Sequence, residues 1–534
     1  MPETGTLPPP PREERGYLGS AGLVSLFTLA SRICGFVRDM AMAAVFHVAL
    51  LDIFFLAFTI PNLFRRLFGE GALTAAFVPV YSDYIENRGE AEARRLVDAV
   101  TTILTVILAL LAVAGIAICG LLLFASPTPE GRLALLLTQG MLPYLLLVCL
   151  SAFFSAALQT HRRFLVPALA PVLFNVVWIG TLGGIVLAGK GDSEEGLFVL
   201  AGAVLGAGVL QVAILLPSLA ARGALPRPRW EPRHDGVLRV AHAMAPVALG
   251  LAVFEVNVLA DRLIAWWLVP DRGAITVLYL ANRLIQFPLA LVAVAIGTAV
   301  FPDLARFAAR GASEEQSRTI GEAMRVTLFL DLPAAVGLAV LARPMIVTLF
   351  GRGEFDPSSV GRTAVVLACY AAGLWCFSSV VLLTRSFHAR GDTRTPFRTS
   401  FAAVAANLAL NLALVRPFAE AGLAAATTLS SFLNLVLLVR ADRASPSRLP
   451  LVEVARSLAR SAAYAAAMGG ALALPALAFP WEVAGELARA GALLASIAAG
   501  GIVYFGAAAL FRSPELARMM ARLRSRRARR EVLE

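Results

Sequence analysis

Apolar segments of about 18 or more residues recur along this 534-residue chain from Leu23 to Phe511, and each is long enough to cross about 30 Å of hydrocarbon. Apolar residues make up 58% of the chain and charged residues only 16%, whereas soluble proteins are about 25% charged. The segments are continuous and rich in Leu and Ala, unlike the short alternating strands of an outer-membrane barrel. The sequence therefore predicts an all-α, polytopic membrane protein.

We expect about fourteen transmembrane helices. They are predicted at residues 22–46, 52–81, 97–124, 134–158, 165–188, 197–220, 237–267, 274–301, 322–342, 359–386, 397–415, 421–439, 453–477 and 488–511. Arginine collects in alternate loops, around Arg94, Arg162, Arg229, Arg310, Arg394 and Arg443. Because positive loops stay on the cytoplasmic side, we expect an inner (cytoplasmic) membrane protein of a bacterium with both termini in the cytoplasm.

An internal similarity predicts how the helices are grouped. Residues 76–79, followed by Asp83, resemble residues 299–302 with Asp303, and residues 158–167 resemble 387–396. The offsets are similar, which predicts two pseudo-symmetric six-helix lobes with the same orientation and two appended helices. The expected parts are a disordered cytoplasmic leader (1–19), an N-lobe (20–222), a C-lobe (237–440), helices 13 and 14 (450–512) and a basic cytoplasmic tail (513–534).

Charge and motifs argue against several classes of protein. The net charge of +11 is carried by alternate loops and the basic tail, which favours contact with membrane lipids rather than nucleic acid. The five cysteines lack CxxC spacing, the five histidines lack metal-ligand spacing, and no GxxxxGK[ST] loop is present. We therefore expect a protein that is not an enzyme and has no resident cofactor.

Charged residues within the first two predicted helices point to function, because charge at bilayer depth usually faces a partner or a wet cavity. Arg38 and Asp39 compensate one another, which leaves Arg32 in need of an anion. Arg32 and Arg38 are six positions apart, about 240° around a straight helix. We expect a bend or unwound turn at Gly35 to bring them together.

Further arginines extend this set into both lobes. Arg66 and Glu70 have the i,i+4 spacing of a structural ion pair, which leaves Arg65 as the better ligand. Arg283 has no carboxylate within one helical turn. Guanidinium groups suit phosphate, so arginines gathered from both lobes predict a site for an anion such as a diphosphate. The alternative is that each arginine reaches a membrane surface or pairs locally.

A second group of polar residues suits a monovalent cation. Asp261 lies in the seventh predicted helix, Asn407 and Asn411 share one face of the eleventh, and Thr428 lies in the twelfth. Their oxygens suit a hard ion such as Na⁺, with H⁺ as the other coupling ion considered. The alternative is an ion pair of Asp261 with the next arginine and asparagines bonded across helices. Two further buried acids have no assigned role, Glu255 and Asp331.

Several motifs closely resemble the MurJ (MviN) lipid II flippases of the multidrug/oligosaccharidyl-lipid/polysaccharide exporter superfamily. The resemblance runs in order from about residue 20 to 440. It is carried by residues 31–39, Asp52, residues 61–72 and 76–79, and later by Asn282-Arg283-Leu284, Phe287-Pro288, Phe301-Pro302, residues 349–353 and residues 391–396.

This resemblance implies flipping of an undecaprenyl-diphosphate-linked peptidoglycan precursor, lipid II, to the periplasmic leaflet by alternating access. The implied substrate-binding residues are Arg32, Arg38, Asp39, Asp52, Arg65 and Arg283. Helices 13 and 14 would form a groove for the lipid tail, and some members bind sodium near residues resembling Asp261, Asn407, Asn411 and Thr428. Asn282 and Gln286 stand where some relatives have acids, so the coupling ion stays open. We expect a monomer.

The sequence leaves two alternative functions open. A flippase for another polyprenyl-diphosphate-linked glycan, of the O-antigen type, would share this architecture and its need for an anion site. A polytopic glycosyltransferase would need acidic residues in large interfacial loops. The longest loop here is basic and contains only Glu231 and Asp235 as acids, which makes this the remote alternative.

Overall fold

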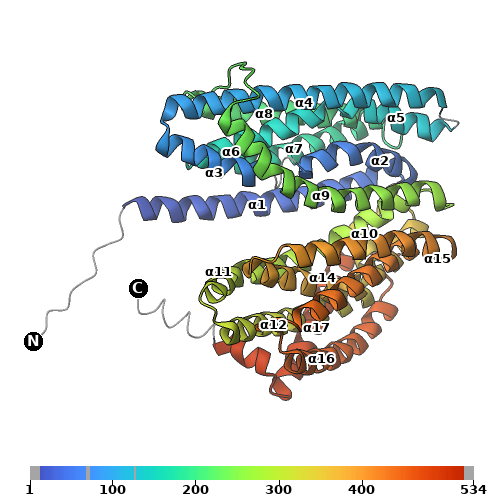
Figure 1. The fold of residues 1–534 in the computed structure, drawn as a ribbon. Coiled ribbons are helices and arrows are strands. Elements are labelled where there is room, and N and C mark those ends of the chain that lie inside the picture. The colour runs from blue at the N-terminus through green and yellow to red at the C-terminus, as the bar shows by residue number, and fades with distance from the viewer. Residues whose placement is uncertain (1–11, 68–72, 126–127, 522–534) are drawn as a thin grey trace, which may run out of the picture. The chain divides into compact units, whose positions relative to one another are not determined.

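The computed structural model describes residues 12–67, 73–125 and 128–521, and no strand occurs within these ranges (Figure 1). The predicted all-α class is confirmed. The chain divides into two compact units, Met1–Glu255 (unit 1) and Val256–Glu534 (unit 2). The long helix α9 (Asp235–Leu268) begins in unit 1 and ends in unit 2.

Twelve helical segments among the described residues are long and apolar enough to cross a membrane. Helix α1 (Arg12–Val45) is not one of them, and α15 (Arg394–Asp442) counts once. Yet the backbone of α15 breaks at Ala419, where φ is 49°, between the predicted helices 397–415 and 421–439. Pro417 lacks the N–H that a continuous helix would need. The count of fourteen stays a prediction.

Unit 1 packs its helices around a cluster of aromatic rings. Besides α1 and part of α9, it contains α2 (Val48–Phe64), α3 (Leu73–Asn87), α4 (Glu90–Ala125), α5 (Pro129–Met141), α6 (Tyr144–Thr160), α7 (Leu165–Leu187) and α8 (Glu194–Ala220). Trp178 is 2% exposed, and its ring lies 5.2–5.7 Å from those of Phe54, Phe58 and Phe174. Ring contacts of this kind fix the face that α7 turns toward α2.

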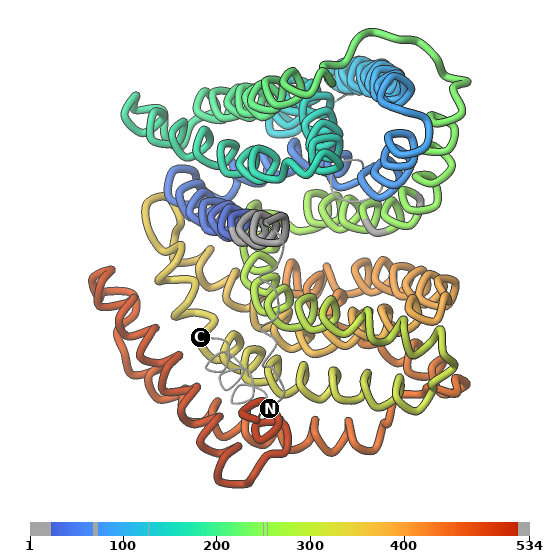
Figure 2. Tube along the Cα trace, turned by 90° about the vertical axis from the view of Figure 1, so that its left-hand side faces the viewer, coloured from blue at the N-terminus to red at the C-terminus, as the bar shows by residue number. Residues whose placement is uncertain are grey.

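Unit 2 is built around α12 and α14. Its elements are α10 (Ala274–Leu289), a π-helical turn η2 (Ala290–Val294), α11 (Ala295–Ala309), α12 (Ser313–Val340), α13 (Ala342–Phe350), α14 (Pro357–Ala389), α15, α16 (Leu451–Ala478) and α17 (Glu486–Leu510). Helices α16 and α17, orange-red and red in Figure 2, pack against each other and against α12. The buried Tyr504 of α17 donates a hydrogen bond to the Phe329 carbonyl of α12 at 2.6 Å.

Several element boundaries differ from the predicted ones. Helix α1 begins at Arg12, so residues 12–19 are helical, although they were expected in the disordered leader. Good helix formers such as Arg and Glu follow the last proline there. The predicted helix 52–81 corresponds to the separate helices α2 and α3. At the other end, the first residues of the predicted basic tail are held in place, because the buried Glu515 accepts a hydrogen bond from Ser457 of α16.

Candidate substrate- and cation-binding sites

Arg38 lies where α1 packs against α7, and its guanidinium has partners on both helices. Its Nε and Nη2 donate to Oδ1 of Asp39 at 3.1 and 2.7 Å, and its Nη1 donates to Oδ1 of Asn175 at 3.2 Å. The guanidinium carbon also lies 4.6 Å from the ring centre of Trp178. The side chains of Arg38 and Asp39 are 14% and 0% exposed. The buried charge is therefore balanced by a carboxylate, an amide and an aromatic face.

Helix α1 is helical through Gly35, so an unwound turn is not found at this residue, and a bend there stays a prediction. In a continuous helix a spacing of six residues sends Arg32 and Arg38 in different directions. Arg32 is exposed, whereas Arg38 is half-buried.

Asn175 joins α7 to α1 and was missed by the sequence argument. Besides accepting from Arg38, it donates from Nδ2 to the carbonyls of Ser31 and Pro171 at 3.3 and 3.0 Å. A lone asparagine inside an otherwise apolar helix was the available signal, because buried amides need partners. Asn175 positions the Arg38 guanidinium.

The end of α2 holds two adjacent arginines with different partners. The backbone forms a π-type turn over residues 65–67. Nε of Arg65 donates to Oδ1 of Asn62 at 3.0 Å, while Nη1 of Arg66 lies 3.3 Å from Oε1 of Glu255 in α9. The predicted partner of Arg66, Glu70, lies outside the described residues. Glu255, which had no role in the sequence argument, therefore pairs with Arg66.

The remaining predicted substrate residues lie in different units. Asp52 is 2% exposed in α2 of unit 1, and Arg283 is half-buried in α10 of unit 2. Arg32, Arg38, Asp39 and Arg65 also belong to unit 1. Arg38 and Asp39 are in direct contact. That arginines of both units meet around one anion stays a prediction.

The predicted cation residues Asp261, Asn407 and Asn411 lie together in unit 2. Nδ2 of Asn411 donates to Oδ1 of Asp261 at 2.6 Å and to Oδ1 of Asn407 at 3.0 Å. The two asparagines are 2% and 0% exposed, and Oδ1 of Asn411 accepts no hydrogen bond from the described residues. This arrangement leaves a buried acceptor oxygen beside a carboxylate, which suits a hard monovalent cation.

The amide of Asn407 has two orientations with different chemical meaning. One of its terminal atoms lies 3.2 Å from Oδ1 of Asp261 and 3.1 Å from Oδ1 of Asn257. As an oxygen, it would complete a converging set of three oxygens that a cation could neutralise. As a nitrogen, it would donate to both oxygens, and the amide oxygen would accept from the backbone N–H of Thr427 at 3.3 Å, which satisfies both ends of the amide. Asn257 was missed by the sequence argument, although it precedes Asp261 by one helical turn.

Thr428 has a different contact from the one predicted. Its hydroxyl donates to the carbonyl of Cys369 in α14 at 2.9 Å. The hydroxyl that lies next to the asparagine pair is Ser430, which Nδ2 of Asn407 contacts at 3.4 Å. Helices α9, α14 and α15 thus share a polar region within unit 2.

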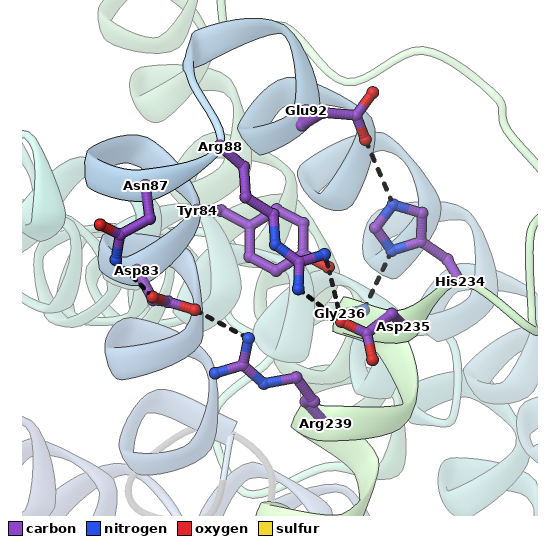
Figure 3. A network of polar contacts seen from close by, with 9 residues as sticks. All are labelled: Asp83, Tyr84, Asn87, Arg88, Glu92, His234, Asp235, Gly236 and Arg239. Carbon is purple, nitrogen blue, oxygen red and sulfur yellow. Dashed lines mark hydrogen bonds and ion pairs between the residues drawn. The ribbon is translucent and has the colours of Figure 1, made fainter.

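A polar network joins the end of α3 to the start of α9 in unit 1 (Figure 3). Asp83 contacts Arg239 at 2.7 Å, and Arg88 contacts Asp235 at 3.0 Å. Hydrogen bonds from Asn87 and from Arg239 hold the pKa of Asp83 below its usual range. The network fixes the start of α9 against the end of α3.

The connection between α8 and α9 is fixed along α4 as well. The backbone N–H of Arg227 donates to Oδ1 of Asp98, and that of Arg229 donates to the Thr102 hydroxyl, both at 2.8 Å. At Gly236 a Cβ atom would lie 2.7–2.8 Å from Leu96 and Tyr84. A larger residue at the start of α9 would therefore require the Leu96 and Tyr84 side chains to move.

Comparisons with known proteins agree with this fold. The family model of the lipid II flippase MurJ matches residues 41–489. A protein of Vibrio cholerae serotype O1 named "Probable lipid II flippase MurJ" is 35% identical over 437 residues, which are 79% of this chain and 82% of that protein. The "Lipid II flippase MurJ" of Burkholderia cenocepacia is 34% identical over 78% of this chain and 81% of its own length.

Solved structures are similar at lower identity. A lipid II flippase MurJ in an inward closed conformation has a TM-score of 0.75 and 23% identity, covering 92% of this chain and 98% of its own. An inward-facing multidrug resistance transporter of the MATE family and MOP superfamily has a TM-score of 0.64 and 13% identity, covering 81% and 95%. These two likenesses concern the fold, whereas the matched model and the sequence identities show that the chain belongs to the lipid II flippase MurJ family.

Proposed function

We propose that this protein flips lipid II, the undecaprenyl-diphosphate-linked peptidoglycan precursor, from the cytoplasmic to the periplasmic leaflet by alternating access. The observation that carries the proposal is the Arg38 site, where a half-buried guanidinium is held between α1 and α7 in a chain of this family. A fixed cation at this depth suits the diphosphate of a lipid-linked substrate.

Asp39 would regulate access to Arg38. Two donors of the guanidinium face Oδ1 of Asp39, so a diphosphate has to compete with this carboxylate. Binding of substrate would exchange one anionic partner for another, which lets the arginine hold and then release its ligand. Arg283 would supply a second cation for the same substrate from unit 2, with Arg32, Asp52 and Arg65 contributing to the same site.

A depletion strain whose own lipid II flippase can be shut off tests the proposal. We expect the wild-type chain to restore growth, and Arg38→Ala and Arg283→Ala to abolish rescue at unchanged protein levels. Arg318→Ala is the matched control, because this arginine is 80% exposed and belongs to a surface pair with Glu322. Normal growth with either site variant would contradict the proposal.

The same kind of growth assay distinguishes lipid II flipping from the second candidate function. The architecture alone also suits another polyprenyl-diphosphate-linked glycan of the O-antigen type, and no observation favours it over lipid II. Rescue of a strain lacking its O-antigen flippase, without rescue of the lipid II strain, would select that substrate. No described residue set provides the acidic catalytic loops of a glycosyltransferase, so we propose a transporter and not an enzyme.

We further propose a monovalent cation as the coupling ion, with Na⁺ at Asp261, Asn407 and Asn411 as the site to test. The unpaired Oδ1 of Asn411 beside the carboxylate supports it. Exchange of Na⁺ for K⁺ should slow flipping by purified protein in liposomes, and Asp261→Asn should remove this sensitivity. Equal rates in both salts would contradict sodium coupling.

Orientation and oligomeric state complete the proposal. The distribution of arginine among the loops favours cytoplasmic termini in the inner membrane, and helices 13 and 14 (α16 and α17) would guide the lipid tail of a monomer. Reporter fusions that are active only in the cytoplasm should give signal at both ends. Light scattering of the purified protein in detergent should give the mass of one chain.

A further inference from the structure

Asp331 is a buried acid of unit 2 that the proposed function does not use. It lies in α12, well inside a helix that is long and apolar enough to cross the membrane. Its exposed fraction is 0%, and among the described residues neither of its carboxyl oxygens has a hydrogen-bond partner. Buried carboxylates normally have partners, so this one requires an explanation.

Two buried hydroxyls, one on α14 and one on α12, are candidates to contact the carboxyl. The Ser378 hydroxyl of α14 faces the carboxyl, and it forms no hydrogen bond within the described ranges. Thr327 precedes Asp331 by one helical turn and has an equally buried, unbonded hydroxyl. Three oxygen-bearing side chains thus lie within the packed region of α12 and α14 without satisfying one another.

No charged group of the described chain compensates Asp331. Arg325, on the same helix, contacts Glu453 at 2.6 Å, and Tyr504 donates to the Phe329 carbonyl. Ser378, on the helix α14 that packs against α12, is placed to form a hydrogen bond with the carboxyl. An ionised Asp331 would therefore be an uncompensated charge in a low-dielectric interior, where desolvation of an ion costs several kcal/mol.

We propose that Asp331 is a proton-binding site, in which the bound proton forms a hydrogen bond from the carboxyl to the Ser378 hydroxyl oxygen. A proton neutralises the acid and requires only one acceptor. A metal cation would need about six oxygen ligands, whereas the site offers one carboxylate and two hydroxyls. The proton comes from water and returns to it, so no other reactant is needed.

This site does not depend on the proposed function, because its occupancy can be measured without lipid II. It adds a proton-binding site to unit 2, besides the proposed cation site. Asp261 has amide neighbours that suit Na⁺, whereas Asp331 has hydroxyl neighbours that suit a proton. A flippase that uses H⁺ would have in Asp331 a group that binds it away from the asparagine cluster.

Infrared spectroscopy of the full-length protein in lipid nanodiscs at neutral pH tests the proposal. A protonated carboxyl gives a C=O stretching band that moves in D₂O. We expect this band in the wild-type protein, its loss in Asp331→Asn, and its retention in the matched control Asp261→Asn. Ser378→Ala should keep the band but shift its frequency, because the acceptor of the proton is removed.

Three results would overturn the proposal: a wild-type spectrum without the band, a band that survives in folded Asp331→Asn, or a band that disappears as Na⁺ replaces K⁺. If Asp331→Asn fails to fold, the spectrum of Ser378→Ala tests the proposal instead. An unshifted band in that variant would show that the protonated carboxyl is not hydrogen-bonded to Ser378, which contradicts the proposal. Failure of lipid II flipping with an intact band would count against the proposed function alone.

Discussion

Asp39 in α1 and Asp331 in α12 are both buried acids, and they are neutralised in different ways. Asp39 in unit 1 is 1% exposed and contacts Arg38 at 2.7 Å. Asp331 in unit 2 is 0% exposed and has no cation beside it in the described structure. The first acid belongs to an ion pair, which a competing anion can open. The second has to take up a proton.

Burial alone therefore does not predict the role of such an acid. An adjacent arginine makes Asp39 part of a permanent charge pair whose strength depends on geometry. Without such a neighbour, Asp331 is neutral only when protonated. The side chain beside the acid, which the neighbouring helices supply, determines whether the site binds an anion or a proton.

The largest expected effect is that of Asp39→Asn. Removing the charge of one partner of a buried ion pair typically costs about 3–5 kcal/mol. Thermal or denaturant unfolding of the purified protein in detergent measures this loss. Asp303→Asn is the control, because it removes an exposed i,i+3 pair with Arg306 and should cost less than about 1 kcal/mol. Equal losses in the two variants would remove the distinction between buried and exposed pairs.

Trp178→Leu should have an intermediate effect. It removes the aromatic face below Arg38 while keeping an apolar side chain, so the lost cation–π contact and packing should cost about 2 kcal/mol. We expect lower growth rescue than with the wild type, together with a reduced free energy of unfolding. Combination with Asp39→Asn should be non-additive, because both act on one guanidinium. Strict additivity would show that Trp178 acts only through the aromatic core.

Asp331→Asn should change stability by less than about 1 kcal/mol, because an amide replaces a carboxyl that is already neutral. The same substitution at Asp39 is costly, so the pair of variants measures the contrast directly by unfolding in detergent at neutral pH. A destabilisation of Asp331→Asn as large as that of Asp39→Asn would mean that Asp331 is charged and has a cationic partner.

The smallest effect concerns the half-buried carboxylate of Asp83. Its pKa is lowered in the folded protein, so its contribution to stability is present above the unfolded pKa and is lost as the pH falls through the folded pKa. We expect hydrogen exchange at the start of α9 to increase in mild acid. Asp83→Asn should show faster exchange already at neutral pH and little further change in acid.

Much of the fold follows from apolar runs and loop charge alone. The break at Ala419 lies between two helices that the sequence separates correctly, because Pro417 and a charged segment interrupt the apolar pattern there. The boundary between α2 and α3 was missed, since polar and apolar residues of 61–72 continue a helical pattern. Local pattern predicts element type better than it predicts where an element ends.

Within the candidate sites, contacts near in sequence were easier to predict than distant ones. Arg38 with Asp39, and Asn407 with Asn411, follow from spacing. Asn175 as partner of Arg38 was not predictable, because the two are 137 positions apart. The Arg66–Glu255 contact was missed for the same reason: no single-sequence pattern records which helices become neighbours.

The course of α9 through both units has a mechanical consequence. Glu255 contacts Arg66 in unit 1. Asp261, six positions further along the helix, accepts a hydrogen bond from Asn411 in unit 2. Six residues of helix rise only about 9 Å. The two contacts therefore lie about 1.7 turns apart on one helix, so a change in the helical backbone between them would alter both.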